Sequence, residues 1–316
     1  MATIKDVARL AGVNPSTVSR VFSGKAPVKK ETSEKVFKVA KELGFSFNRT
    51  ARNLVLGQQS IPIIGVAVPT ITHPFFMEIL KGLTETFEES DSSLMIFNLG
   101  RRSELVYTRI LSEGLAGLIL LSTAGSPEFQ DRILAQRIPT VAVDYPTEKF
   151  SSVTVDHLQG GLLAAEYLIN KGCTKPFYLG EKFDTPQQKD RWTGFQKRWA
   201  KAGVLEIPQW RIQQGESTAQ EAVRMILERQ DWDGLFCYCD EMAYGAMRAL
   251  REAKKNFPLV GYDDLTPSRY VGLSTIHQPG LEMGIVGARL LQLTMDNPNS
   301  PPEHQVLQPE IRLRST

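Results

Sequence analysis

From residue 61 onward, short runs of apolar residues alternate with longer segments in which apolar residues recur every three or four positions. Continuous apolar runs are typical of buried strands, and a repeat of three to four predicts an amphipathic helix. The predicted strands cover 61–68, 94–99, 118–121, 140–143, 176–180, 235–239 and 259–262. The predicted helices among them include 75–88, 157–171, 188–202, 219–229, 241–252 and 280–295. This alternation predicts parallel sheets covered by helices on both faces, and the length allows two such units.

The first 23 residues follow a different pattern, which predicts two short helices on either side of Gly12. Thr3 is a suitable N-cap, and Asp6 lies where a capping box places its acidic partner. Gly12 favours the positive φ that ends many helices. Asn14 followed by Pro15 is a typical start for a second helix, because proline in the first turn gives up no hydrogen bond.

The second predicted helix has an apolar side and a polar side. Val18 and Val21 form the apolar side, whereas Ser16, Thr17, Ser19 and Arg20 are predicted to face outward. A third helix is predicted over residues 29–43, with Gly44 after it. Two short helices around a glycine turn, the second polar and basic on its outer side, are typical of a DNA-binding helix-turn-helix. An ordinary small helical bundle has the same spacing, so the spacing alone leaves both interpretations open.

Charge favours the DNA-binding interpretation. Residues 1–60 hold 11 Lys and Arg against 4 Asp and Glu, a net charge of +7, whereas the remainder holds 26 against 31, a net charge of −5. A basic head on an acidic body is the charge distribution expected of a module that binds phosphates. Like-charged surface is usually only solvated, but here it coincides with the helix-turn-helix.

Composition and motifs exclude several other classes. The 316 residues exceed one ordinary domain, and 42% are hydrophobic, as in a water-soluble globular protein. No apolar run reaches the ~20 residues of a membrane helix, and the N-terminus lacks the apolar core of an export signal. Three cysteines without framework spacing suit the reducing cytoplasm. We find no catalytic, phosphate-loop or zinc motif, and expect no enzymatic activity, no cofactor and no metal.

Residues 47–60 read as a connection between head and body. Asn48 is able to cap a short helix, and Gly57 with the polar residues after it is typical of a linker. A helix this short is marginal in water and needs a partner to form. The alternative is a plain linker in which Leu54 packs on the body.

The run D-V-A-x-x-A-G-V-x-x-x-T-V-S-R-V-F over residues 6–22 resembles the N-terminus of the lactose-repressor (LacI/GalR) family of bacterial transcription regulators. Residues 261–264 (G-Y-D-D), 273–279 (L-S-T-I-H-Q-P) and 312–316 extend the resemblance over almost the whole chain. It implies an α/β fold, with a small all-α headpiece (1–46), a hinge helix and linker (47–60) and a two-lobed periplasmic-binding-protein-like body (61–316). Lobe one is expected at about 61–156 and 280–306, and lobe two at about 157–279 and 307–316, with crossings near Asp156, Pro279 and Val306.

The resemblance also implies which residues contact double-stranded DNA. Its second helix enters the major groove, where Arg20 is suited to a bidentate contact with guanine. In the hinge helix a leucine enters the minor groove and kinks the DNA. Two departures, Phe47 in place of a proline and Val55 in place of a basic residue, weaken the expected hinge contact. The predicted DNA-binding residues are Thr3, Pro15, Ser16, Thr17, Ser19, Arg20, Asn48, Ala51, Arg52 and Leu54.

The effector site is predicted from strand ends, because ligands of open α/β sheets bind beyond the carboxyl ends of the strands. In the family, residues matching Asp144, Arg191 and Asp263 line the cleft. Carboxylates that accept from hydroxyls and a guanidinium favour a small polar effector, expected to be a sugar or sugar derivative. The predicted ligand-binding residues are His73, Phe75, Asp144, Arg191, Asp240 and Asp263.

Each of these residues has a structural alternative. A strand-end aspartate often caps a helix, Arg191 is able to pair with Asp190 or Asp144, and the aromatic residues near 73–76 are suited to a core. Cys239 stands where sugar-binding members carry asparagine, which indicates a ligand other than a simple hexose. Cys237 and Cys239 lie at alternate positions of the predicted strand without a suitably spaced histidine, so a metal site is not expected.

The sequence therefore predicts a ligand-responsive DNA-binding regulator, expected to repress carbohydrate-related genes. Two heads on a two-fold axis predict a homodimer, or a dimer of dimers, on a pseudo-palindromic operator. The alternative is a solute-binding protein for a small polar ligand, which the body alone would support. The basic head and the missing export signal argue against that alternative.

Overall fold

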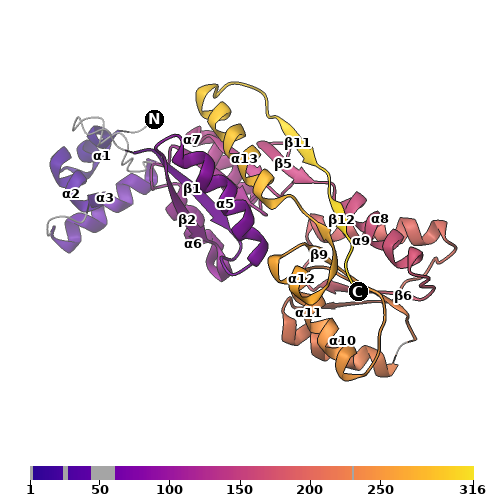
Figure 1. The fold of residues 1–316 in the computed structure, drawn as a ribbon. Coiled ribbons are helices and arrows are strands. Elements are labelled where there is room, and N and C mark those ends of the chain that lie inside the picture. Colours follow the sequence, from indigo (N-terminus) through magenta and orange to yellow (C-terminus); the bar gives the residue numbers. More distant parts are fainter. Residues whose placement is uncertain (1–2, 24–27, 44–60, 230) are drawn as a thin grey trace.

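The computed structural model describes residues 3–23, 28–43, 61–229 and 231–316. They form a small helical head, a first lobe and a second lobe that follow one another in a row, with the C-terminus in the second lobe (Figure 1). None of the helices in these ranges is long and apolar enough to cross a membrane.

The head consists of α1 (Ile4–Ala11), α2 (Pro15–Ser23) and α3 (Lys30–Glu42). The predicted capping box is present, since the Asp6 amide donates to Thr3 Oγ1 and the Thr3 amide donates to Asp6 Oδ2. Gly12 ends α1 with a φ of 67°, as its position predicted. Leu10, although at helical spacing, is 55% exposed. The buried core of the head comprises Val7, Ala8, Ala11, Val18, Val21, Val36 and Ala40.

The first lobe is built on a parallel six-stranded sheet of order β11-β5-β4-β3-β1-β2. Alternate strand residues point to opposite faces: Ile64, Val66 and Val68 of β1 face α5 and α13, whereas Ala67 packs with α6 and α7. The elements are β1 (Ile63–Val68), α5 (Pro74–Glu88), β2 (Ser93–Asn98), the short 3₁₀ helix η1 (Gly100–Arg102), α6 (Ser103–Ile110), β3 (Gly117–Leu121), α7 (Pro127–Gln136), β4 (Thr140–Val143), β5 (Ser151–Val155), α13 (Gly280–Asp296) and β11 (His304–Leu307).

The second lobe repeats this plan with a sheet of order β12-β10-β9-β8-β6-β7, in which β12 alone runs antiparallel to its neighbour. Helices α8 and α9 cover one face, and α10 and α11 cover the other. The elements are α8 (His157–Asn170), β6 (Pro176–Glu181), α9 (Pro186–Lys201), β7 (Gln209–Ile212), α10 (Glu216–Arg229), β8 (Gly234–Cys237), α11 (Asp240–Glu252), β9 (Leu259–Asp263), α12 (Thr266–Val271), β10 (Ser274–His277) and β12 (Glu310–Arg312).

The chain passes between the sheets after β5, after β10 and after β11. These passages matter for the site, because they bring the carboxyl ends of strands from both lobes to the boundary between them. Asp156, directly after β5, caps α8 by accepting from the Gln159 amide at 2.8 Å. The first residue of that helix, His157, therefore lies at the boundary itself.

The predicted α/β fold is confirmed, and each strand and helix predicted within the described residues has a counterpart. The predicted hinge helix lies outside the described residues. Strands β5, β7, β10, β11 and β12 were not predicted, because they are short and several are half-exposed edge strands with few apolar residues. Two predicted strands were too long: β1 begins only at Ile63, and β8 ends at Cys237, with Cys239 as the N-cap of α11. Asp240 thus begins a helix, three residues after the last residue of the strand.

Candidate functional site

The first candidate site is the outer side of α2 in the head. Pro15, Ser16 and Arg20 are exposed, and Thr17 and Ser19 are half-buried. Val18 and Val21, by contrast, lie in the core of the head, and this fixes the side that α2 presents outward. The helix has no acidic residue in its first turn, so its positive dipole end is not compensated by its own side chains. An exposed helix with these hydroxyls and a guanidinium is suited to contact phosphates and base edges.

The other predicted DNA contacts are placed differently. Thr3 is exposed, but its hydroxyl is engaged in the capping box, donating to Asp6 Oδ2 at 2.7 Å. Thr3 therefore stabilises the start of α1. Its contact with DNA stays a prediction. Asn48, Ala51, Arg52 and Leu54 lie outside the described residues.

The second candidate site is a buried polar network at the boundary between the lobes. On the lobe-one side, Asp144 follows β4 in the left-handed region with a φ of 58°, a conformation that aspartate tolerates. Its Oδ2 accepts from Ser122 Oγ at 2.9 Å, and its Oδ1 lies 3.2 Å from His157 Nε2. The carboxylate is thus fixed by a hydroxyl of its own lobe and by the first residue of α8.

On the lobe-two side, Arg191 of α9 is buried with its guanidinium 3.6 Å from the ring centroid of Tyr262. Its Nη1 donates to the Tyr238 carbonyl at 2.8 Å, and its Nε donates to His157 Nδ1 at 3.4 Å. Because arginine only donates, His157 Nδ1 accepts and the ring proton sits on Nε2, from which it is donated to Asp144. Burial, reinforced by the neighbouring Arg191, lowers the pKa of His157 and keeps it neutral.

Two glycines make this arrangement possible. A Cβ on Gly161 of α8 would lie 2.0 Å from the Arg191 carbonyl oxygen, and a Cβ on Gly194 of α9 would lie 2.0 Å from the Leu158 carbonyl oxygen. Helices α8 and α9 therefore cross at backbone contact, a spacing that any side chain would forbid. The close crossing holds His157 and Arg191 within hydrogen-bonding distance.

Asp263 ends β9 beside this network. Its Oδ1 accepts from Gln278 Nε2 at 2.6 Å, whereas its Oδ2 and Gln278 Oε1 are buried without a hydrogen-bond partner. Burial raises the pKa of Asp263 well above its ordinary value, although the nearby Arg191 acts in the opposite direction. Unpaired buried acceptors are costly and indicate a place where a donor from outside the chain would bind.

Two glutamines of lobe two reach across the boundary. Gln187 Nε2 donates to Ser122 Oγ at 3.1 Å and also to the Asp144 carbonyl. Gln214 Nε2 lies 2.9 Å from Nε2 of His73, the residue before α5. His73 stacks on Phe76 with a centroid distance of 4.6 Å, and burial lowers its pKa to about 4. His73 is therefore neutral at pH 7.

Two predicted ligand residues have structural partners within their own lobe. Phe75 is 3% exposed and belongs to the apolar core of lobe one, and its contact with a ligand stays a prediction. Asp240 is fully buried, and its carboxylate accepts from the Leu265 amide, Ser268 Oγ and Thr275 Oγ1 at 2.6–2.8 Å. These donors come from the segments before and within α12 and from β10, so Asp240 ties neighbouring parts of lobe two together.

The structure thus brings His73, Asp144, Arg191 and Asp263 to one boundary, whereas Phe75 packs in the core of lobe one and Asp240 is held by donors of lobe two. Contact with a ligand stays a prediction for all six. Four further residues of the network were not predicted from the sequence: Ser122, His157, Gln187 and Gln214. Ser122, directly after β3, and His157, directly after the first passage between the sheets, stand at positions that the strand-end rule could have indicated. The two glutamines carry no comparable local signal.

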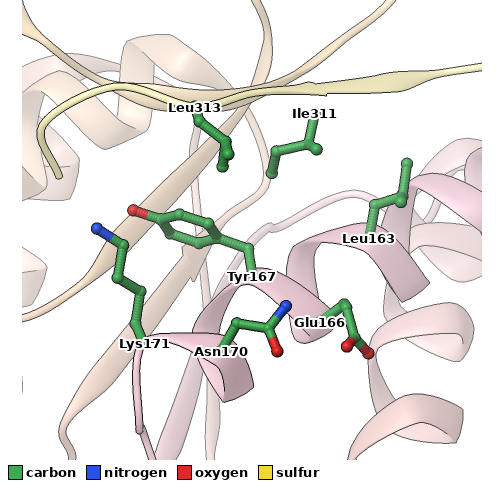
Figure 2. A pocket seen from close by; sticks show the side chains of 7 residues that line it. All are labelled: Leu163, Glu166, Tyr167, Asn170, Lys171, Ile311 and Leu313. Carbon is green, nitrogen blue, oxygen red and sulfur yellow. The ribbon is translucent and has the colours of Figure 1, made fainter.

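A separate pocket of about 230 Å³ lies on lobe two between α8 and the segment around β12. Figure 2 shows Tyr167 extending from α8 beneath Ile311 and Leu313, with Lys171 beside its hydroxyl end. None of the residues predicted to bind ligand lines this pocket; its lining residues are Leu163, Glu166, Tyr167, Asn170, Lys171, Ile311 and Leu313. We therefore place the candidate effector site at the boundary between the lobes.

A head with an outward-facing helix-turn-helix and a body with a buried polar site between two lobes define a ligand-responsive, DNA-binding transcription regulator. Comparison with known proteins agrees. Residues 3–48 match the model for bacterial regulatory proteins of the lacI family, and residues 165–316 match the periplasmic binding protein-like domain. The chain belongs to the lacI family.

Similar proteins cover nearly the whole chain. The HTH-type transcriptional regulator RegA of Clostridium saccharobutylicum is 31% identical over 98% of this chain and 99% of its own length. The ribose operon repressor of Haemophilus influenzae is 29% identical over 100% of this chain and 98% of its own. Among solved structures, the complex of the transcriptional regulator CelR with cellobiose has a TM-score of 0.73 at 26% identity, covering 99% of both chains.

Proposed function

We propose that this protein is a repressor that binds a pseudo-palindromic operator as a homodimer and responds to a sugar or sugar derivative bound between its lobes. The observation that carries the proposal is the fixed orientation of α2, whose apolar side is buried in the head while Ser16 and Arg20 are exposed. A relative named for the ribose operon and a structural neighbour solved with cellobiose support a carbohydrate-related effector.

Each part of the chain has a separate task in this proposal. Residues 1–46 read the operator, residues 47–60 form a hinge that contacts the minor groove through Leu54, and residues 61–316 bind the effector and the second subunit. Arg20 reads a base, while Thr17 and Ser19 hold phosphates and set the register of the helix. We propose no enzymatic activity, and action on chromosomal DNA places the protein in the cytoplasm.

The effector acts through the boundary between the lobes. Gln187 and Gln214 of lobe two contact lobe one directly. A ligand that binds their partners in lobe one would break these contacts and change the angle between the lobes. A change of lobe angle would alter the pairing of the two heads and with it the affinity for DNA. The change in DNA affinity is limited by the difference in ligand affinity between the two arrangements.

The test is an Arg20→Ala variant of the full chain. Operators are first selected by the wild-type protein from random duplex DNA, and affinities are then measured by fluorescence anisotropy. We expect two-fold-related half-sites for the wild type, and a loss of about 1–3 kcal/mol per half-site with relaxed preference at one base pair for the variant. Lys38→Ala, which removes an exposed charge from α3 of the same head, is the matched control. Unchanged base preference in Arg20→Ala would contradict the proposal.

A further inference from the structure

The effector site has an excess of hydrogen-bond acceptors. Asp263 Oδ2, Gln278 Oε1 and Glu181 Oε2 at the end of β6 are buried acceptors without partners, whereas one buried donor of the site, His73 Nδ1, lacks an acceptor. Asp263 is 5% exposed and Glu181 7%, so water does not readily serve these atoms. Carboxylate oxygens only accept when ionised, and Gln278 uses its amide nitrogen on Asp263. A ligand that completes the site must therefore donate more hydrogen bonds than it accepts.

Gln214 joins a second pair of carboxylates to the boundary between the lobes. Its side-chain Nε2 lies 2.9 Å from His73 Nε2, 3.4 Å from Cys239 Sγ and 3.4 Å from Glu241 Oε2. Its backbone amide donates to the Glu181 carboxylate. Burial raises the pKa of Glu181, and the negative charge of nearby Glu241 acts in the same direction. Two acidic groups thus flank a residue that already touches lobe one.

This acidic pair is continuous with the Asp263 part of the site. Cys239 contacts Gln214 on one side, and on the other it lies near Asp263, whose charge adds to burial in raising the pKa of the thiol. Cys239 and Gln214 therefore link the Asp263 carboxyl to Glu181 and Glu241 through a chain of neighbouring residues.

Positive charge in the network is scarce. Of the described residues named in it, Arg191 is the only one with a fixed positive charge, and its guanidinium is engaged by the Tyr238 carbonyl, His157 and the ring of Tyr262. His73, with its pKa of about 4, adds no charge at pH 7. A phosphate or carboxylate ligand would meet mainly negative charge here. A metal ion is not favoured either, because no group of three or more His, Cys, Asp or Glu in the described ranges is arranged to hold one.

We infer that the effector is a polyhydroxylated molecule with a protonated amine, an amino sugar being the simplest such class. The ammonium group lies between Glu181 and Glu241 and neutralises their repulsion, while hydroxyl groups donate to Asp263 and Gln278. This inference rests on the proposed function, since it specifies the chemistry of the same effector site. Cys239 lies between the carboxylates that bind the ammonium group and the acceptors that bind the hydroxyl groups. Its thiol is a poor hydrogen-bond acceptor, so it does not compete for the donors of the ligand.

The experiment compares matched ligands on the full chain. Glucosamine, galactosamine and mannosamine are each paired with the neutral hexose, and glucose 6-phosphate serves as the anionic probe. Thermal shift ranks the compounds, and calorimetry at pH 7 gives the affinities. We expect at least one amine to bind about tenfold more tightly than its neutral partner, as one charge-assisted hydrogen bond would provide.

The Glu241→Gln variant keeps the shape of the side chain and removes its charge. We expect it to lower the affinity for the amine by about tenfold more than the affinity for the neutral hexose, and so to abolish the preference for the amine. Glu221→Gln makes the same charge change on the exposed side of α10 and should keep the preference. Equal binding of amine and hexose, tighter binding of the phosphate, binding of none of the probes, or a preference that survives Glu241→Gln would each overturn the inference.

The same protein samples are tested for binding to the selected operator, which separates this inference from the proposed function. Specific operator binding without an amine preference would overturn the inference alone. Failure of the wild-type protein to bind any DNA sequence specifically would overturn the proposed function.

Discussion

The two lobes share a scaffold but differ in what they present at their boundary. Each has a six-stranded sheet with helices on both faces, and in each a pair of helices crosses at two glycines, Gly82 with Gly284 in lobe one and Gly161 with Gly194 in lobe two. In lobe one, Asp144 is already hydrogen-bonded through both carboxylate oxygens. In lobe two, acceptor atoms of Asp263, Gln278 and Glu181 are buried without partners, whereas the unpaired buried atom that lobe one brings to the boundary is a donor, His73 Nδ1.

This difference indicates a division of labour. Lobe two holds the unsatisfied acceptors and the buried arginine, so it is the lobe prepared to recognise a ligand. Lobe one supplies Ser122, Asp144 and His73, which contact lobe two directly. A ligand bound by lobe two would compete with these contacts or add to them, and the lobe angle is the quantity that would change.

The largest effect is expected for Arg191→Ala. The substitution removes the donor to the Tyr238 carbonyl and the positive charge beside Asp144 and Asp263. We expect ligand affinity to fall at least about 100-fold, roughly the 3 kcal/mol of a charged hydrogen bond left unmade in a buried site. Calorimetry with the tightest ligand of the thermal-shift screen measures it. Arg132→Ala on the exposed side of α7 in lobe one is the control, and retained affinity in Arg191→Ala would remove the arginine from the site.

The glycine crossings allow a direct comparison of the lobes. A Cβ on Gly194 would lie 2.0 Å from the Leu158 carbonyl oxygen, and a Cβ on Gly284 2.2 Å from the Ile79 carbonyl oxygen. Each glycine-to-alanine change should lower the free energy of unfolding by about 2–3 kcal/mol, because a packed helix pair must separate. Urea titration measures this loss.

Only one of the two changes should also weaken ligand binding. Gly194→Ala pushes apart the helices that carry His157 and Arg191, whereas Gly284→Ala separates α13 from α5, away from the His157–Arg191 contact. Equal effects of both variants on ligand affinity would mean that the two lobes share the recognition, contrary to the division proposed above.

Much of the fold was predictable because its causes are local. The capping box of Thr3 and Asp6 and the left-handed Gly12 are set by residues within three or four positions of one another. The buried strands follow from continuous apolar runs, as in β4, whose predicted and observed bounds agree. Edge strands such as β7 and β11 escaped prediction because their partly exposed residues carry no such run.

The site was predictable only in part, since it depends on contacts between distant segments. The strand-end rule led to Asp144 and Asp263, which the structure places at the boundary; their contact with a ligand stays a prediction. Gln187 and Gln214 gain their roles from the other lobe, more than 40 positions away in the sequence. For Asp240 the strand-end rule predicted the position of the residue but not the orientation of its side chain. That orientation is set by hydrogen-bond donors up to 35 residues later in the sequence.

The smallest effect is expected from Asp240→Asn. This variant tests whether the Asp240 carboxylate holds lobe two together or binds the ligand. Burial raises the pKa of Asp240 from an ordinary value of 3.8 to about 7, although three hydrogen bonds act in the opposite direction. A carboxyl group whose pKa is higher in the folded state stabilises the protein most below the unfolded pKa. That contribution declines as the pH rises from about 4 and is lost once the pH passes the folded pKa. The wild type should therefore lose about 1 kcal/mol between pH 6 and pH 7 through this group.

Asparagine does not titrate, so the difference in unfolding free energy between wild type and Asp240→Asn should shrink by that amount across the same pH range. Urea titrations at pH 6 and pH 7 measure it. Calorimetry should find ligand affinity within about twofold of wild type if Asp240 acts independently of the ligand, because independent sites couple by only about 0.3–0.5 kcal/mol. The opposite pattern, lost ligand binding with an unchanged pH slope, would return Asp240 to the effector site. It would then follow that the ligand replaces the three donors that now bind Asp240. The ligand-binding residues of lobe two would in that case include Asp240 as well as Asp263.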